Sequence, residues 1–127
     1  MIIEINTLSA TTICDQIRDQ IVLGIAAKKL EPNEPLPSVR SLAADLGINY
    51  HTVNKAYSLL CDESYIVMDR RKGAVVAHSI TNGDEFMEKL SRTLLLTSAE
   101  AICHNMSETE FVKLCADCYQ KAKGGTP

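Results

Sequence analysis

The chain has 127 residues, of which 46% are hydrophobic and 23% charged. This is the composition of a soluble globular protein with one compact domain and an appended element, and it is too short for a large catalytic fold. The net charge of −3, from 13 basic and 16 acidic residues, excludes a polycation that coats nucleic acid or membranes, so any nucleic-acid contact must be local.

No stretch reaches the ~18 apolar residues of a membrane span, and the N-terminus lacks the features of a signal peptide. Five cysteines without a secretory signal are typical of reduced thiols. We therefore expect a cytoplasmic protein with no membrane partner.

The first expected helix is marked by an isoleucine at every fourth position. This period places the four side chains on one face, which must be buried. We expect the helix to begin between Ser9 and Thr12 and to end near Lys29. It cannot enter the connector at residues 31–37, whose three prolines fix φ and remove amide donors. The stripe consists of Ile13, Ile17, Ile21 and Ile25.

Two short helices are expected next, separated by a break at Gly47 and Ile48. Ser38 is the predicted N-cap of the first, and Gly47 can adopt the left-handed conformation that ends it. Asn49 is the predicted N-cap of the second. Two helices joined by so tight a turn form a helix-turn-helix. The positions expected inside are Val39, Leu42, Ala43 and Leu46 on the first helix and Val53, Ala56, Tyr57 and Leu60 on the second.

β-rich residues follow in two runs, at residues 65–68 and 74–77. The connection between them, DRRKG, gives the predicted hairpin a cationic tip. Three helices followed by a hairpin is the element order of a winged helix-turn-helix, in which the hairpin is the wing. We therefore expect a mainly α fold, with a winged helix-turn-helix DNA-binding domain over residues 1–78.

The remaining residues, 79–127, are predicted to form a two-helix C-terminal dimerisation element. The first helix covers residues 84–104, and a capping box of Ser107 and Glu110 opens the second. Disorder is expected only at residues 124–127. The apolar stripes of the two helices need a partner, so we expect a homodimer. Its predicted interface is Phe86, Leu90, Leu94, Phe111, Leu114 and Tyr119.

A polar face on the third expected helix suits DNA. A recognition helix reads base edges with donors and acceptors near its N-terminus. Asn54 can pair bidentately with adenine, and Thr52 can contact a thymine methyl group. Arg40 and Lys55 can anchor phosphates or read guanine, and the wing tip can enter a minor groove or clamp the backbone. The predicted contacts with double-stranded DNA are Ser38, Arg40, Asn49, Tyr50, His51, Thr52, Asn54, Lys55, Arg70, Arg71 and Lys72.

Two segments, LPSVRSLAADLGINYHTVNKAYSLL and YIVMDRRKGAVV, carry a family resemblance. Through them, residues 12–77 resemble the DNA-binding domain of the GntR family of bacterial transcription regulators. The short tail is similar to the YtrA-like subfamily, in which two C-terminal helices mainly form a homodimer. The resemblance implies a dimeric repressor that binds an inverted-repeat operator, often near genes for ATP-driven membrane transporters. By family position it implies DNA contacts at Arg40, residues 49–52, Asn54, Arg70 and Arg71.

The sequence departs from the common family pattern at three positions. Tyr50 and Asn54 stand where many members carry arginine, and Arg71 stands where a wing-tip glycine is frequent. These departures affect the base preference and not the fold, and Arg71 widens the turn while adding charge.

Other readings of the sequence stay open. A winged helix can also dock on another protein. This would need an apolar patch on the third helix or the wing, and Tyr50 is the one candidate there. A thiol- or metal-responsive regulator would use Cys115 and Cys118. A lone CxxC is a weak zinc signal, however, and both cysteines fall on the apolar stripe of the last helix, where a free cysteine packs as a small hydrophobe. We therefore expect no metal and no cofactor.

No nucleophile with a base, paired carboxylates or glycine-rich phosphate loop has usable spacing, so we do not expect an enzyme. A small-molecule effector, bound between dimer halves or beside the first helix, stays open because the sequence identifies none.

Overall fold

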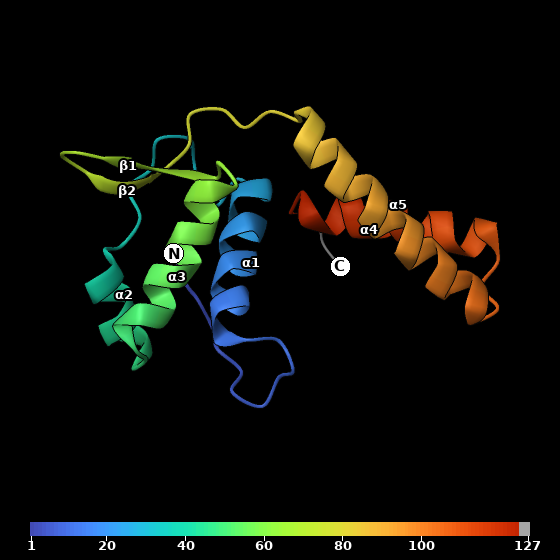
Figure 1. The fold of residues 1–127 in the computed structure, drawn as a ribbon, viewed down its shortest axis with the longest axis horizontal. Coiled ribbons are helices and arrows are strands. Elements are labelled where there is room, and N and C mark those ends of the chain that lie inside the picture. The colour runs from blue at the N-terminus through green and yellow to red at the C-terminus, as the bar shows by residue number, and fades with distance from the viewer. Residues whose placement is uncertain (125–127) are drawn as a thin grey trace. The chain divides into compact units, whose positions relative to one another are not determined.

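The computed structural model describes residues 1–124, and these form five helices and one two-stranded sheet (Figure 1). The described chain divides into two compact units, one ending at Ile80 and the other beginning at Thr81. Residues 125–127, which belong to the segment with predicted disorder, lie outside the described residues. None of the helices within residues 1–124 is both long and apolar enough to cross a membrane.

The first helix, α1, spans Ile13–Ala26 and is capped by the hydroxyl of Thr12. Of its isoleucine stripe, Ile17 and Ile21 are completely buried, whereas the outer two are partly buried against the same core. The helix ends at Ala26, before the predicted end near Lys29. Lys28 takes the left-handed conformation, with φ of 60°, and this turns the chain out of the helix.

The helix-turn-helix consists of α2 (Val39–Leu46) and α3 (Tyr50–Asp62). Both predicted N-caps are confirmed. The Ser38 hydroxyl accepts a hydrogen bond from the third amide beyond it at 3.0 Å, and Asn49 Oδ1 accepts one from the second at 2.7 Å. Gly47 is left-handed, with φ of 66°, as its place after α2 predicts.

One hydrophobic core joins α1, α3 and the wing. All four α3 positions expected inside are buried, namely Val53, Ala56, Tyr57 and Leu60. The Tyr57 hydroxyl donates a hydrogen bond of 2.7 Å to the carbonyl oxygen of Pro37. This bond ties α3 to the connector at residues 31–37, called the proline connector below, which precedes α2.

The wing consists of β1 (Ile66–Asp69) and β2 (Gly73–Val76), paired antiparallel. The predicted hairpin is therefore confirmed. The proline connector lies along its outer edge, because the amide of Leu36 donates to the carbonyl of Ala74 at 2.8 Å. This contact, which no local pattern predicts, fastens the wing to the segment that leads into α2.

The second unit contains α4 (Asp84–Cys103) and α5 (Glu108–Ala122). The predicted capping box is confirmed, since the Ser107 hydroxyl accepts from the Glu110 amide at 3.1 Å and the Glu110 carboxylate accepts from the Ser107 amide at 3.1 Å. Neither helix has a buried residue in the single chain. The two helices therefore lack a core of their own.

Candidate nucleic-acid interface

The outward face of α3 is polar and exposed. Because the apolar positions of α3 follow the helical period towards α1, the positions between them point away from the core. Tyr50, His51, Asn54 and Lys55 are exposed, and Thr52 is half-exposed. Within residues 1–124 the side chains of Asn54 and Lys55 make no hydrogen bond or ion pair. Their donors and acceptors are therefore available to an external partner.

Two of the predicted contact residues also cap helices. Ser38 and Asn49 each use a side-chain oxygen to accept a backbone amide. The hydroxyl proton of Ser38 and the amide NH₂ of Asn49 remain as donors. These two side chains can therefore donate to phosphate oxygens while still capping α2 and α3.

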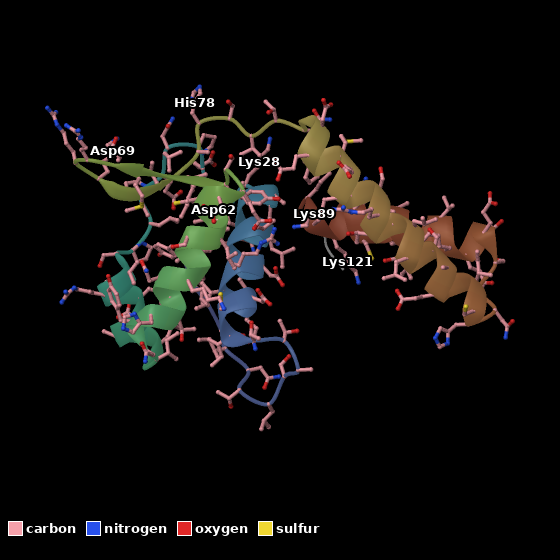
Figure 2. All side chains as sticks on the ribbon, viewed as in Figure 1. Lys28, Asp62, Asp69, His78, Lys89 and Lys121 are labelled. Atoms are coloured by element: carbon pink, nitrogen blue, oxygen red, sulfur yellow. The ribbon has the colours of Figure 1, made fainter. Side chains whose placement is uncertain are left out.

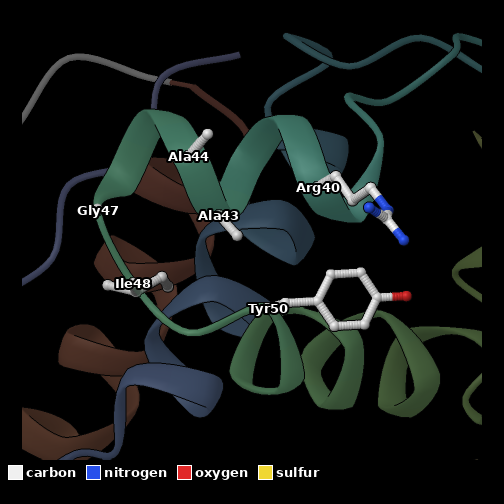
Figure 3. Close-up of a pocket in the computed structure, with 6 residues that line it drawn as sticks. All are labelled: Arg40, Ala43, Ala44, Gly47, Ile48 and Tyr50. Carbon is white, nitrogen blue, oxygen red and sulfur yellow. The ribbon is translucent and has the colours of Figure 1, made fainter.

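A hollow of about 570 Å³ lies between α2 and the start of α3 (Figure 3). Its lining is apolar or small except for Arg40 and Tyr50. The Arg40 guanidinium carbon lies 5.7 Å from the centre of the Tyr50 ring. The residues around the hollow are Arg40, Ala43, Ala44, Gly47, Ile48 and Tyr50. The helix-turn-helix thus presents the Arg40 guanidinium and the Tyr50 phenol at an open hollow whose other lining residues are small or apolar.

The wing tip carries the three cations predicted there, Arg70, Arg71 and Lys72, all exposed. Asp69 organises the turn, because its Oδ1 accepts from the amides of Arg71 at 2.7 Å and Lys72 at 3.0 Å. These hydrogen bonds, that from Lys72 most of all, lower the pKa of Asp69 below its ordinary value. Figure 2 shows long nitrogen-bearing side chains extending outward from the tip beside Asp69.

Both candidate DNA-contacting elements belong to the first unit. In Figure 1 the wing tip and α2 project from the same side of that unit, at the left of the view. The structure therefore places α2 and the wing tip, which are separated in sequence, on the same side of the first unit.

The thiols of the chain fall into two groups. Burial raises the pKa of both Cys14 and Cys61, which lie in or against the core. Cys103, Cys115 and Cys118 are exposed. The expectation that Cys115 and Cys118 pack as small hydrophobes is thus not met within one chain, because neither helix of the tail has a core to pack into. In the described part of the chain, no three His, Cys, Asp or Glu side chains are grouped to hold a metal ion.

The fold and this surface define a class, the winged helix-turn-helix proteins. The sequence profile of the bacterial regulatory proteins of the gntR family matches residues 11–76. The chain belongs to the GntR family. This is a family of transcription regulators and not of enzymes, as the sequence predicts.

Named relatives are consistent with this membership. The chain is 34% identical over 80 residues to the HTH-type transcriptional regulator YhcF of Bacillus subtilis, a match covering 63% of this chain and 66% of YhcF. It is 35% identical over 77 residues to the transcriptional repressor YtrA of the same organism, covering 61% of this chain and 59% of YtrA. The matches span less than two thirds of the length of these relatives.

Two solved structures resemble the chain over most of its length. A transcriptional antiterminator from Listeria monocytogenes EGD-e superposes with a TM-score of 0.91 at 26% identity, covering 100% of this chain and 96% of that one. The GntR-family transcription factor YtrA from Sulfolobus acidocaldarius is 42% identical, with a TM-score of 0.62, over 75% of this chain and 99% of its own. The likeness to the Listeria structure includes the two tail helices as well as the winged helix.

Proposed function

We propose that this regulator is a sequence-specific repressor that acts in the cytoplasm as a homodimer on an inverted-repeat operator. DNA binding is assigned to residues 1–78 and dimerisation to residues 79–127. The family resemblance makes transporter genes the first targets to examine. The observation that carries the proposal is the polar outward face of α3, whose Asn54 and Lys55 side chains make no hydrogen bond or ion pair within residues 1–124.

The charge distribution supports DNA over a protein partner. The net charge of the chain is −3, yet five exposed cations occupy α2, α3 and the wing tip. The one large apolar side chain exposed on α3 is Tyr50, which by itself is too little for an apolar docking patch. The wing exposes two more, Val67 and Met68 on β1, next to its cationic tip. A local cluster of cations around hydrogen-bonding side chains is the surface that phosphates and base edges require. The cations are Arg40, Lys55, Arg70, Arg71 and Lys72.

The tail supports the homodimer. Leu94 is 46% exposed and Tyr119 is 67% exposed in the single chain, as are other large apolar residues of α4 and α5. An apolar surface of this kind is typical of an interface, and a second copy supplies a matching one. A dimer also sets two recognition helices at a fixed spacing, as two operator half-sites require. An effector that changed this spacing would release DNA.

Selection from a random duplex pool tests the DNA proposal and finds the operator sequence in the same experiment. We expect the full chain to enrich an inverted repeat, and its binding by fluorescence anisotropy to weaken steeply as salt increases. Asn54→Ala should cost about 1–3 kcal/mol of binding free energy and relax the preference at one position, and Lys55→Ala should reduce the salt slope by about 1.

Lys29→Ala is the matched control, because Lys29 is an exposed lysine beyond the end of α1. This variant should bind like the wild type. Enrichment of no sequence, with equal weak binding to all duplexes, would reject the proposal and favour the protein-docking alternative.

Sedimentation tests the homodimer. Leu90→Asp together with Leu114→Asp places two charges on the proposed interface and should convert the dimer to a monomer. Leu8→Asp is the control, since Leu8 is 94% exposed in the first unit. A double variant that sediments as a dimer would place the interface elsewhere.

A further inference from the structure

Arg40 in α2 and Tyr50 in the first turn of α3 are in contact across the helix-turn-helix. The 5.7 Å between the Arg40 guanidinium carbon and the Tyr50 ring centre is within the range of cation–π attraction. The Tyr50 ring in turn meets the His51 ring edge-on, with centres 5.6 Å apart and planes at 85°. Figure 3 shows the guanidinium and the Tyr50 hydroxyl at the same open end of the hollow.

Within residues 1–124 the Tyr50 ring is the one cation–π partner of the Arg40 guanidinium. Arg40 makes no hydrogen bond and no ion pair there. Its other neighbours around the hollow are small or apolar, as with Ala44 and Gly47, and the hollow has about 570 Å³ of open space. Without the ring, no hydrogen bond or ion pair would hold the guanidinium in one orientation beside the hollow.

We propose that Tyr50 is a positioning residue that holds Arg40 ready to read one guanine in each operator half-site. The inference rests on the proposed function, and it assigns Tyr50 an indirect role in place of a base contact of its own. Arginine reads guanine through paired hydrogen bonds to O6 and N7, which require a defined plane and direction of the guanidinium. The attraction to the ring uses none of the five N–H donors of arginine.

The energetic gain comes from preorganisation. An arginine side chain loses rotamer freedom when it is fixed on a base, and a side chain that is already held loses less on binding. A cation–π contact at an exposed site is worth enough to change the affinity for guanine at that position by about two- to fivefold. The expected effect is therefore modest in affinity and confined to one base pair.

Selection of sites from a random duplex pool, read by sequencing, tests the inference with the full chain. Arg40→Ala should abolish the preference for guanine at one position of each half-site. Tyr50→Leu, which keeps an apolar side chain without a π face, should weaken the same preference about two- to fivefold. Tyr50→Phe, which keeps the ring and removes the hydroxyl, should retain it. In the double variant Arg40→Ala, Tyr50→Leu, the second substitution should have no further effect at that position.

The outcomes distinguish a failure of the proposed function from a failure of this inference. A wild-type chain that enriches no sequence rejects sequence-specific binding itself. A wild-type chain that enriches a site, with Arg40→Ala altering one position and Tyr50→Leu altering a different one, means that Tyr50 reads a base directly and overturns the inference. Loss of the preference in Tyr50→Phe also overturns it, because the hydroxyl and not the ring would then be the active group.

Discussion

Arg18 in α1 and Glu63 at the C-terminal cap of α3 form a two-pronged ion pair. Arg18 Nε lies 2.9 Å from Glu63 Oε1, and Arg18 Nη2 lies 2.9 Å from Glu63 Oε2. The Arg18 side chain is 22% exposed and that of Glu63 is 27% exposed. The hydrogen bonds from Arg18 to Glu63 raise the pKa of Arg18 above its ordinary value. The pair therefore ties the C-terminal end of α3 to α1.

Replacing Arg18 by methionine should destabilise the protein by about 1–3 kcal/mol. The reason is that a partly buried, bidentate, charge-assisted pair is lost. Arg92→Met is the matched control, because the Arg92–Glu88 pair is longer, at 3.8 Å, and its side chains are 71% and 74% exposed. Exposed pairs of this kind contribute little. Urea unfolding at one protein concentration measures the free energy of unfolding of both variants. An equal decrease in the two would contradict the stabilising role of the Arg18–Glu63 pair.

Ionisation of Tyr57 should lower the free energy of unfolding at alkaline pH. Burial raises its pKa from 10.0 to about 12. The folded state therefore favours the protonated phenol more than the unfolded state does. The resulting stability is complete below pH 10 and is lost as pH rises through 12, by about 3 kcal/mol in all.

Tyr57→Phe tests this pH dependence. At pH 8 the variant should be less stable by about 1 kcal/mol, because the hydrogen bond to the Pro37 carbonyl is lost. As pH rises, the gap should shrink and then reverse, since phenylalanine does not ionise. Urea unfolding of both proteins at several pH values from 8 to 12 gives the difference directly. A gap that is constant with pH would show that Tyr57 is not the responsible group.

Asp69 should control the wing tip without affecting overall stability. Asp69→Ala removes the acceptor that holds the Arg71 and Lys72 amides, so the tip must be ordered on binding. Affinity for a selected operator should fall about two- to tenfold for that reason. The lowered pKa of Asp69 means that the carboxylate holds the turn at neutral pH and releases it only in acid, below the ordinary pKa of 3.8.

Asp69→Asn keeps a side-chain oxygen acceptor in the same place and removes the charge. This variant should bind DNA at least as well as the wild type, and both variants should melt at the wild-type temperature. If Asp69→Ala and Asp69→Asn lost affinity equally, the carboxylate charge and not the turn would be the cause.

Gly47 is required by its backbone conformation. Its φ is 66°, and an added Cβ would meet nothing within 4 Å. Gly47→Ala should therefore cost about 1 kcal/mol from left-handed strain alone, and Gly47→Asn should cost less. Gly83 is the control, because its φ is −70° and its surroundings are equally open. Thermal unfolding that places Gly47→Ala and Gly83→Ala at the same midpoint would contradict this account.

The local features of the fold follow from short-range patterns in the sequence. Each of these features depends on residues only a few positions apart, so the sequence predicts it. They are the helix caps at Ser38, Asn49 and Ser107, the helix end at Gly47, and the hairpin after α3. The buried face of α3 was readable for the same reason, since its period is that of a helix. The polar face that remained then indicated DNA.

The long-range contacts, in contrast, are visible only in the folded chain. Arg18 meets Glu63 across 45 positions of sequence, and Tyr57 reaches Pro37 across 20. The cation–π contact of Arg40 with Tyr50 depends on how α2 and α3 cross, and the attachment of Leu36 to β2 depends on the path of the proline connector. Composition and period report which side chains leave water, whereas the partner that each one meets is set by the packing of elements that are distant in the chain.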